Sequence, residues 1–248
     1  MSNISIVDLS IKFRIYHDST PSFKDYFTNI LKKKSKSAYS DFMAVNNVSF
    51  ELSAGDRVGI VGHNGAGKST LLKALCRIYE PSQGTINVSG RIAPLLEIGA
   101  GFHPEFTGRE NIYLNGSILG YTKSQLTEIE QEVIAFAELE EFIDTPVKYY
   151  STGMYMRLAF SLATAVHPEE LVLDEIFAGG DAAFMEKAKA RMHSMIAKAD
   201  IMIMVSHDHN LVKTLCNRVI WMDHGRKIAD GNPDEIIEMY LKGASAHG

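Results

Sequence analysis

The stretch GHNGAGKST, residues 62–70, constrains the fold of this chain more than any other. It matches the pattern G-x-x-x-x-G-K-[ST] and stands between an apolar run, RVGIV, and a helix-forming run, LLKAL. When a glycine-rich turn joins a strand to a helix in this order, the backbone N–H groups of the turn and the N-terminus of the helix can bind the same anion. Lys68 adds a full positive charge, and the Ser69 hydroxyl is a ligand type that suits Mg²⁺. We therefore expect this loop to bind nucleotide phosphates, through Gly62, His63, Asn64, Gly65, Ala66, Gly67, Lys68, Ser69 and Thr70.

The first hundred residues predict a sheet-rich region around this loop. Residues 4–16 alternate as a strand does, and residues 43–62 read as two strands separated at Ala54 and Gly55. After Thr70 a helix is expected to continue to Pro81. Residues 85–97 are expected to form a hairpin that turns at Ser89 and Gly90.

The second half of the chain predicts helices followed by buried strands. Helical periodicity prevails from about 100 to 165 and is clearest at 124–139. The runs LVLDEIF (171–177) and IMIMVSH (201–207) are short, almost continuously apolar, and end in polar residues. They suit buried parallel strands whose carboxyl ends carry a site, so the fold class is α/β.

Polar side chains at the ends of these two runs point to phosphate chemistry. Asp174 can reach the water shell of Mg²⁺, and Glu175 is placed to polarise a water that attacks the γ-phosphate. His207 follows the second run, where it can hydrogen-bond the γ-phosphate or the attacking water. We interpret Lys68, Glu175 and His207 as catalytic, and Ser69 and Asp174 as metal ligands.

The segment YSTGMYMRLAFSLATAV, residues 150–166, supplies a second anion site. Ser151 and Gly153 open a helix, and its N-terminus offers backbone donors and dipole to a phosphate. One chain cannot easily fold both sites onto one nucleotide. Two chains packed head to tail can, each closing the site of the other.

Composition narrows the classes of protein further. The 248 residues are 46% hydrophobic with a net charge of -5, so a nucleic-acid footprint over the whole surface is not expected. No run approaches the roughly 18 to 20 apolar residues that span a bilayer, and the first residues do not read as a secretory signal. Cys76 and Cys216 lack metal-ligand spacing and are expected to be reduced core thiols.

At this point the chain resembles the nucleotide-binding subunits of ABC transporters along essentially its whole length. Four motifs occur in the family's order: the loop 62–70, STGM at 151–154, LVLDE at 171–175 and VSHD at 205–208. The resemblance implies ATP and Mg²⁺ as cofactors and a P-loop ABC ATPase fold, with a mixed β-sheet core, an antiparallel β subdomain and an inserted α-helical subdomain. It implies one domain over 1–248, with core about 1–98 and 166–248, helical subdomain about 99–165, and an insertion about 18–40.

The resemblance also assigns roles residue by residue. Asp181 matches the loop that contacts the opposite protomer, and Ser151, Thr152, Gly153 and Met154 match the signature that completes the partner's nucleotide site. Thr152 and Met154 stand where the wider family has glycine and glutamine. Glu97 stands where the family has a glutamine that senses Mg²⁺, and the resemblance adds it to Ser69 and Asp174 as a metal ligand. Tyr16 matches the aromatic that stacks on adenine, and Phe42 is the competing candidate.

Within that family, residues 95–120, 150–160 and 176–184 are similar to exporters of bacterial cell-surface polysaccharides, closest to the O-antigen type. That similarity implies a homodimer, a separate pair of membrane-spanning subunits, a lipid-linked polysaccharide as substrate, and a peripheral place on the cytoplasmic face of the inner membrane. Some members carry a C-terminal β-domain, for which we expect no room after the EIIEMYLK helix.

Residues 18–40 read as a short amphipathic helix that ends in a lysine run. One interpretation is a surface helix with solvated lysines. The other, which we favour, places it at the membrane, where the lysines meet anionic headgroups or a pyrophosphate.

Two rival classes share the phosphate loop. A cytosolic ABC ATPase acting on DNA or ribosomes usually has tandem cassettes or a long coiled-coil insertion, and this chain has neither. A nucleotide kinase or GTPase would not need a second anion-binding helix N-terminus at 151–154.

Overall fold

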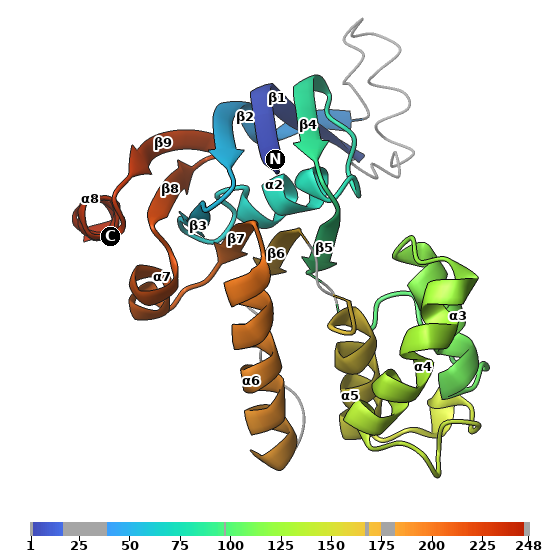
Figure 1. Cartoon of the computed structure of the whole chain (residues 1–248). Coiled ribbons are helices and arrows are strands. Elements are labelled where there is room, and N and C mark those ends of the chain that lie inside the picture. Colours follow the sequence, from blue (N-terminus) through green and yellow to red (C-terminus); the bar gives the residue numbers. More distant parts are fainter. Residues whose placement is uncertain (1, 17–38, 97, 167–168, 175–181, 246–248) are drawn as a thin grey trace, which may run out of the picture.

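A computed structural model describes residues 2–16, 39–96, 98–166, 169–174 and 182–245. Figure 1 shows two β-sheets at one end of the molecule and a group of helices that extends away from them. The sheets contain strands β1 to β9, and the phosphate loop lies between β3 and α2.

The first sheet is antiparallel, with strand order β2-β1-β4. Its strands are β1 (Asn3–Tyr16), β2 (Tyr39–Ser53) and β4 (Gln83–Ser89). Alternate residues of β1, such as Ile4 and Ile6, are buried, as the sequence pattern predicts. The predicted strand over 4–16 is therefore confirmed, and the antiparallel part of the fold class with it.

The second sheet has six strands in the order β5-β6-β7-β3-β8-β9, and all neighbours are parallel except β8 and β9. Because β3, β6 and β7 are parallel, their carboxyl ends meet at one edge, where the phosphate loop begins. The strands are β3 (Arg57–Val61), β5 (Ile92–Leu95), β6 (Glu170–Asp174), β7 (Ile201–Val205), β8 (Arg218–Asp223) and β9 (Arg226–Gly231).

Helices cover both faces of this second sheet. Helix α2 (Lys68–Leu75) packs Leu71, Leu72 and Leu75 into a core that also contains apolar residues of both sheets. The opposite face packs against α6 (Ala182–Lys198), α7 (His209–Leu215) and α8 (Pro233–Ser245). The phosphate loop is therefore held between two apolar cores.

The helical group contains α3 (Gly108–Ile118), α4 (Lys123–Ala137), a 3₁₀ turn (Val147–Tyr149) and α5 (Thr152–Ala163). Most of its buried side chains form an apolar cluster of their own, whereas Phe160 of α5 packs with the core of the second sheet. Thr107 and Thr122 cap α3 and α4, each in a reciprocal capping box. We propose that this group is the helical subdomain, whose predicted limits of 99 and 165 stay a prediction.

The predicted hairpin over residues 85–97 is wrong. β4 pairs with β1 in the antiparallel sheet, whereas β5 pairs with β6 in the other sheet. Gly90 has φ 155° between them, and a Cβ there would approach the Glu170 carboxylate to 2.7 Å. The chain therefore passes from one sheet to the other at the point where the sequence suggests a turn.

The helix that follows Thr70 ends earlier than predicted. Arg77 adopts a left-handed conformation, with φ 57°, and the Ile78 N–H donates to the Lys73 carbonyl. This is a Schellman closure without the usual glycine, which is why the sequence does not reveal it.

Almost all of the predicted 18–40 insertion lies outside the described residues, although its last two residues, Tyr39 and Ser40, begin β2.

None of the described helices combines the length and apolar content needed to span a bilayer. Cys76 and Cys216 are free, and burial raises the pKa of each thiol to about 12.

Candidate nucleotide-binding site

The phosphate loop takes its shape from two glycines that touch neighbouring backbone. Gly62 has φ 152° and Gly67 has φ 96°. A Cβ on Gly62 would lie 2.2 Å from the Met222 carbonyl oxygen, and one on Gly67 would lie 2.3 Å from the Ala44 carbonyl oxygen. Only glycine allows the loop to lie this close to β2 and β8.

The loop ends at the start of α2, where positive charge gathers. Gly67 is the N-cap of α2, and no side chain caps the helix there. The first N–H groups of the helix therefore point outward with its partial positive charge. Lys68 is buried, and its Nζ donates to the carbonyl oxygens of Gly62 at 2.7 Å and His63 at 3.0 Å. The ammonium group is thus held inside the loop, within reach of an anion that enters it.

A cavity of about 480 Å³ opens over this loop. It brings together residues far apart in the sequence, from the loop, β2 and the ends of β6 and β7. Its lining comprises Phe42, Ala44, Asn64, Gly65, Gly67, Lys68, Ser69, Thr70, Leu96, Asp174, Val205 and His207.

The oxygen ligands in this cavity fit Mg²⁺. Ser69 is exposed, and Asp174 is half-buried at the carboxyl end of β6. A hydroxyl and a carboxylate are the oxygen donors that Mg²⁺ prefers, beside a positively charged phosphate loop. Asp174 pairs in register with Val205 of β7, so exposed His207 follows two residues beyond the same edge.

The register of β1 with β2 distinguishes the two aromatic candidates for stacking on the base, Phe42 and Tyr16. Phe42 of β2 is 49% exposed and lines the cavity. It pairs with Phe13 of β1, whereas Tyr16 pairs with Tyr39, three positions further along the ladder. We therefore propose Phe42 as the residue that stacks on the base.

Three predicted residues, Glu97, Glu175 and Asp181, lie outside the described residues. Their roles stay predictions. Sequence reasoning also missed Ala44 and Leu96, which line the cavity and carry no polar signal that could have marked them.

The second predicted anion site lies at the start of α5, apart from this cavity. Ser151 is the N-cap, and its side chain accepts from the Met154 N–H at 3.2 Å. Ser151 and Thr152 are exposed, and Gly153 and Met154 are half-buried. None of the four is among the described residues that line the cavity, and Figure 1 shows α5 in the helical group, away from α2.

A sequence model of one family, described as ABC transporter, matches residues 45–178 of this chain. The chain is 42% identical over 233 residues to the O-antigen export system ATP-binding protein RfbE of Yersinia enterocolitica, with 91% of this chain and 96% of that protein covered. It is 41% identical over 237 residues to the O-antigen export system ATP-binding protein RfbB of Myxococcus xanthus, covering 95% of this chain. The chain spans about half the length of the Myxococcus protein, 54%.

The fold is also similar to solved structures. One is a dimeric structure of the ATP-binding cassette MJ0796, in a post-hydrolysis state bound to ADP and phosphate. It aligns with a TM-score of 0.66 and 18% identity, over 93% of this chain and 98% of that one. At 18% identity, the similarity shows only that the two chains share a fold.

Proposed function

This chain belongs to the ABC transporter family, and we propose that it is the ATP-binding subunit of an exporter that moves a lipid-linked, O-antigen-type polysaccharide across a bacterial inner membrane. The convergence of Lys68, Ser69, Asp174 and His207 on one cavity carries this proposal. The relatives named as O-antigen export proteins support the substrate class, and they argue against the nucleic-acid alternative.

Each residue of the cavity has a part in the proposed hydrolysis of ATP. Lys68 and the loop N–H groups bind the β- and γ-phosphates, and Ser69 and Asp174 hold Mg²⁺. Bound Mg²⁺ supplies positive charge that offsets the phosphate charges. His207 donates a hydrogen bond to the γ-phosphate, and Glu175 takes a proton from the attacking water.

We propose that a second copy of the chain completes the site. The start of α5 offers backbone donors and dipole but lies apart from the cavity of its own chain. In a head-to-tail homodimer, Ser151 and Gly153 of each protomer would close the nucleotide site of the other, and Asp181 would lie at the contact. The solved cassette with a similar fold is described as dimeric, which supports a pair of chains.

A groove of about 500 Å³ between α2, β5 and α3 is our candidate for the membrane partner's docking surface. Its rim carries two strongly exposed apolar residues, Ile78 and Ile118, and two cations, Arg77 and Arg91. The relatives are named as ATP-binding proteins of O-antigen export systems. We propose that a cytoplasmic helix of the separate membrane-spanning subunit binds here, one per protomer, and holds this chain at the inner membrane surface.

The test replaces the Lys68 side chain in the bacterium that carries this chain. Lys68→Ala should abolish ATP hydrolysis by the purified chain, remove the long-chain glycan from the cell surface, and leave lipid-linked glycan inside the cell. Lys189→Ala, on the exposed side of α6, is the matched control and should behave as wild type. Loss of hydrolysis with normal surface glycan would refute the export function and leave the ATPase assignment standing.

A further inference from the structure

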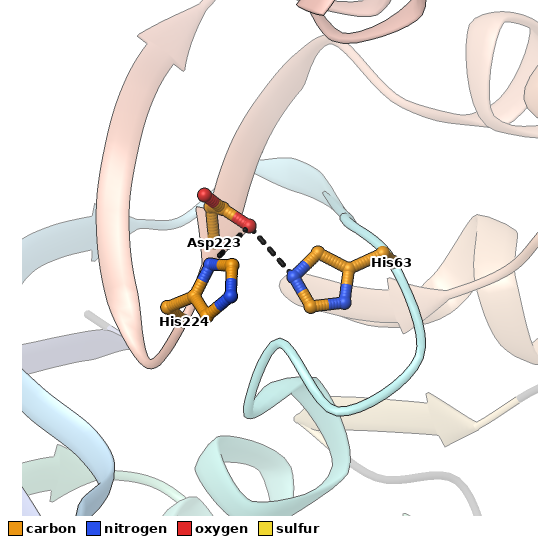
Figure 2. Close-up of side chains that lie close together, drawn as sticks. All are labelled: His63, Asp223 and His224. Carbon is orange, nitrogen blue, oxygen red and sulfur yellow. Dashed lines mark ion pairs between the residues drawn. The ribbon is translucent and has the colours of Figure 1, made fainter. Parts of the chain in front are cut away.

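Three metal-ligating side chains meet beside the phosphate loop (Figure 2). His63 comes from the loop itself, and Asp223 and His224 come from the turn between β8 and β9. His63 Nε2 lies 2.7 Å from Asp223 Oδ1, and His224 Nδ1 lies 3.0 Å from the same oxygen. All three ligand atoms lie within 4.8 Å of one another.

The hydrogen bonding of His63 fixes which of its nitrogens is available. Its Nδ1 lies 2.6 Å from the carbonyl oxygen of Asn64, which can only accept. Nδ1 therefore carries a proton, and Nε2, which faces the Asp223 carboxylate, is the nitrogen that either a second proton or a metal ion can occupy. His63 Nε2 and Asp223 Oδ1 both carry lone pairs, so at 2.7 Å a proton or a metal cation has to lie between them.

Without a metal, a proton on His63 Nε2 and the Nδ1–H of a neutral His224 can each donate to the Asp223 carboxylate. A metal ion would take the place of both protons and bind all three groups at once, since their ligand atoms lie within 4.8 Å of one another and the two imidazole rings lie 4.9 Å apart, centroid to centroid. The contact of His63 Nδ1 with a backbone carbonyl is also the kind of outer contact that orients a metal-binding histidine.

The turn itself favours a functional role for His224. His224 and Gly225 both have positive φ, 45° and 77°, and Asp223 pairs with Arg226, so the turn is a two-residue hairpin. Asparagine before glycine is the preferred pair in such turns, although histidine also occurs at positive φ. An 82% exposed histidine at this position is not explained by packing.

We propose that His63, Asp223 and His224 form a binding site for a divalent transition metal of the Zn²⁺ type. Two imidazoles and one carboxylate are a ligand set of zinc sites that keep a fourth position open, here to solvent. Mg²⁺ prefers oxygen ligands, so this site is distinct from the one at Ser69 and Asp174.

A bound ion would join the β8–β9 turn to the phosphate loop. The two already touch, since the Gly225 N–H donates to the Ala66 carbonyl at 3.0 Å. The His63 carbonyl accepts from Lys68, so an ion on this side chain would also steady the loop around its lysine. Metal binding is therefore expected to raise the melting temperature of the nucleotide-free chain.

The test is a titration of the untagged, nucleotide-free chain with Zn²⁺ by calorimetry and with Co²⁺ by visible absorption. We expect one site per chain, lost or weakened by about tenfold or more in His224→Asn. Asparagine suits the turn, so this variant should melt no lower than wild type without metal. His193→Asn, an exposed histidine on α6, is the matched control and should bind as wild type.

Equal affinity in wild type and His224→Asn would overturn the proposal. So would an absence of tetrahedral Co²⁺ absorption and of thermal stabilisation by Zn²⁺, which would leave the cluster as an ion pair between His63 and Asp223. Mg²⁺ should act equally on wild type and His224→Asn, because its proposed ligands are Ser69 and Asp174, and stabilisation by Mg²⁺ that is lost in His224→Asn would also count against the proposal.

Discussion

Glu170 is a buried carboxyl group that lies outside the nucleotide site. It begins β6 with no exposed surface, and neither carboxylate oxygen has a hydrogen-bond partner among the described residues. Burial, then the charges of Glu169 and Asp200, raise its pKa to about 7. The folded chain therefore binds this proton more tightly than the unfolded chain does, and stability falls as the pH rises from about 4.5 to about 7.

Glu170→Gln should remove this fall in stability with rising pH. Above pH 7 the variant is expected to be more stable by on the order of 3 kcal/mol, and near pH 4.5 the two proteins should be similar. Urea unfolding of both proteins at pH 5 and pH 8 measures the difference. Exposed Glu128→Gln is the control, and a stability difference that does not change with pH would show that Glu170 does not carry this penalty.

At the scale of elements, α3 ends where the helical group meets the sheet. Its last residue, Ile118, is 65% exposed and lines the groove with Ile78, the residue after the left-handed Arg77 that ends α2. Two helix ends thus present apolar side chains at one groove. A large apolar residue left exposed in this way is typical of a surface that binds another protein.

Ile118→Lys should weaken binding to the membrane subunit, because it would place a charge in an apolar contact. ATP hydrolysis by the isolated chain should stay near the wild-type rate, since Ile118 does not line the nucleotide cavity. The measurement is the fraction of chain that sediments with membranes containing that subunit. Phe142→Lys, an exposed apolar residue outside the groove, should sediment as wild type; equal loss in both variants would argue against docking here.

At the scale of the whole molecule, the proposed dimer would join the cavity of one chain to the start of α5 of the other, which a single chain keeps apart. A Cβ on Gly153 would meet only the Ser151 Oγ, at 3.9 Å, so a larger residue fits there without disturbing the fold. An acidic side chain at that point would repel a nucleotide phosphate from the partner chain.

Lys68→Ala and Gly153→Asp should therefore each abolish hydrolysis as homodimers and restore it when mixed. In the mixed dimer one composite site keeps both an intact Lys68 and an intact Gly153. Steady-state phosphate release from a mixture of the two variants measures this. Full activity of Gly153→Asp alone, with the mixture at the average of its two components, would show that each chain acts alone, as expected of a nucleotide kinase.

The sequence by itself determined the phosphate loop, the strands that precede it and follow it, and the polar residues at their ends. Lys68, Ser69, Asp174 and His207 meet as predicted because each sits at a fixed place beside a strand, and carboxyl ends of parallel strands share an edge. Such relations are local, so they can be read from neighbouring residues.

Only the tertiary structure decided which distant segments meet. It placed β4 and β5 in different sheets, brought Phe42 to the cavity through the register of β1 with β2, and joined His63 to Asp223. It also left Glu170 buried among acidic groups. These outcomes depend on apolar surfaces that are buried together across long sequence separations, and no local pattern specifies that choice of partners.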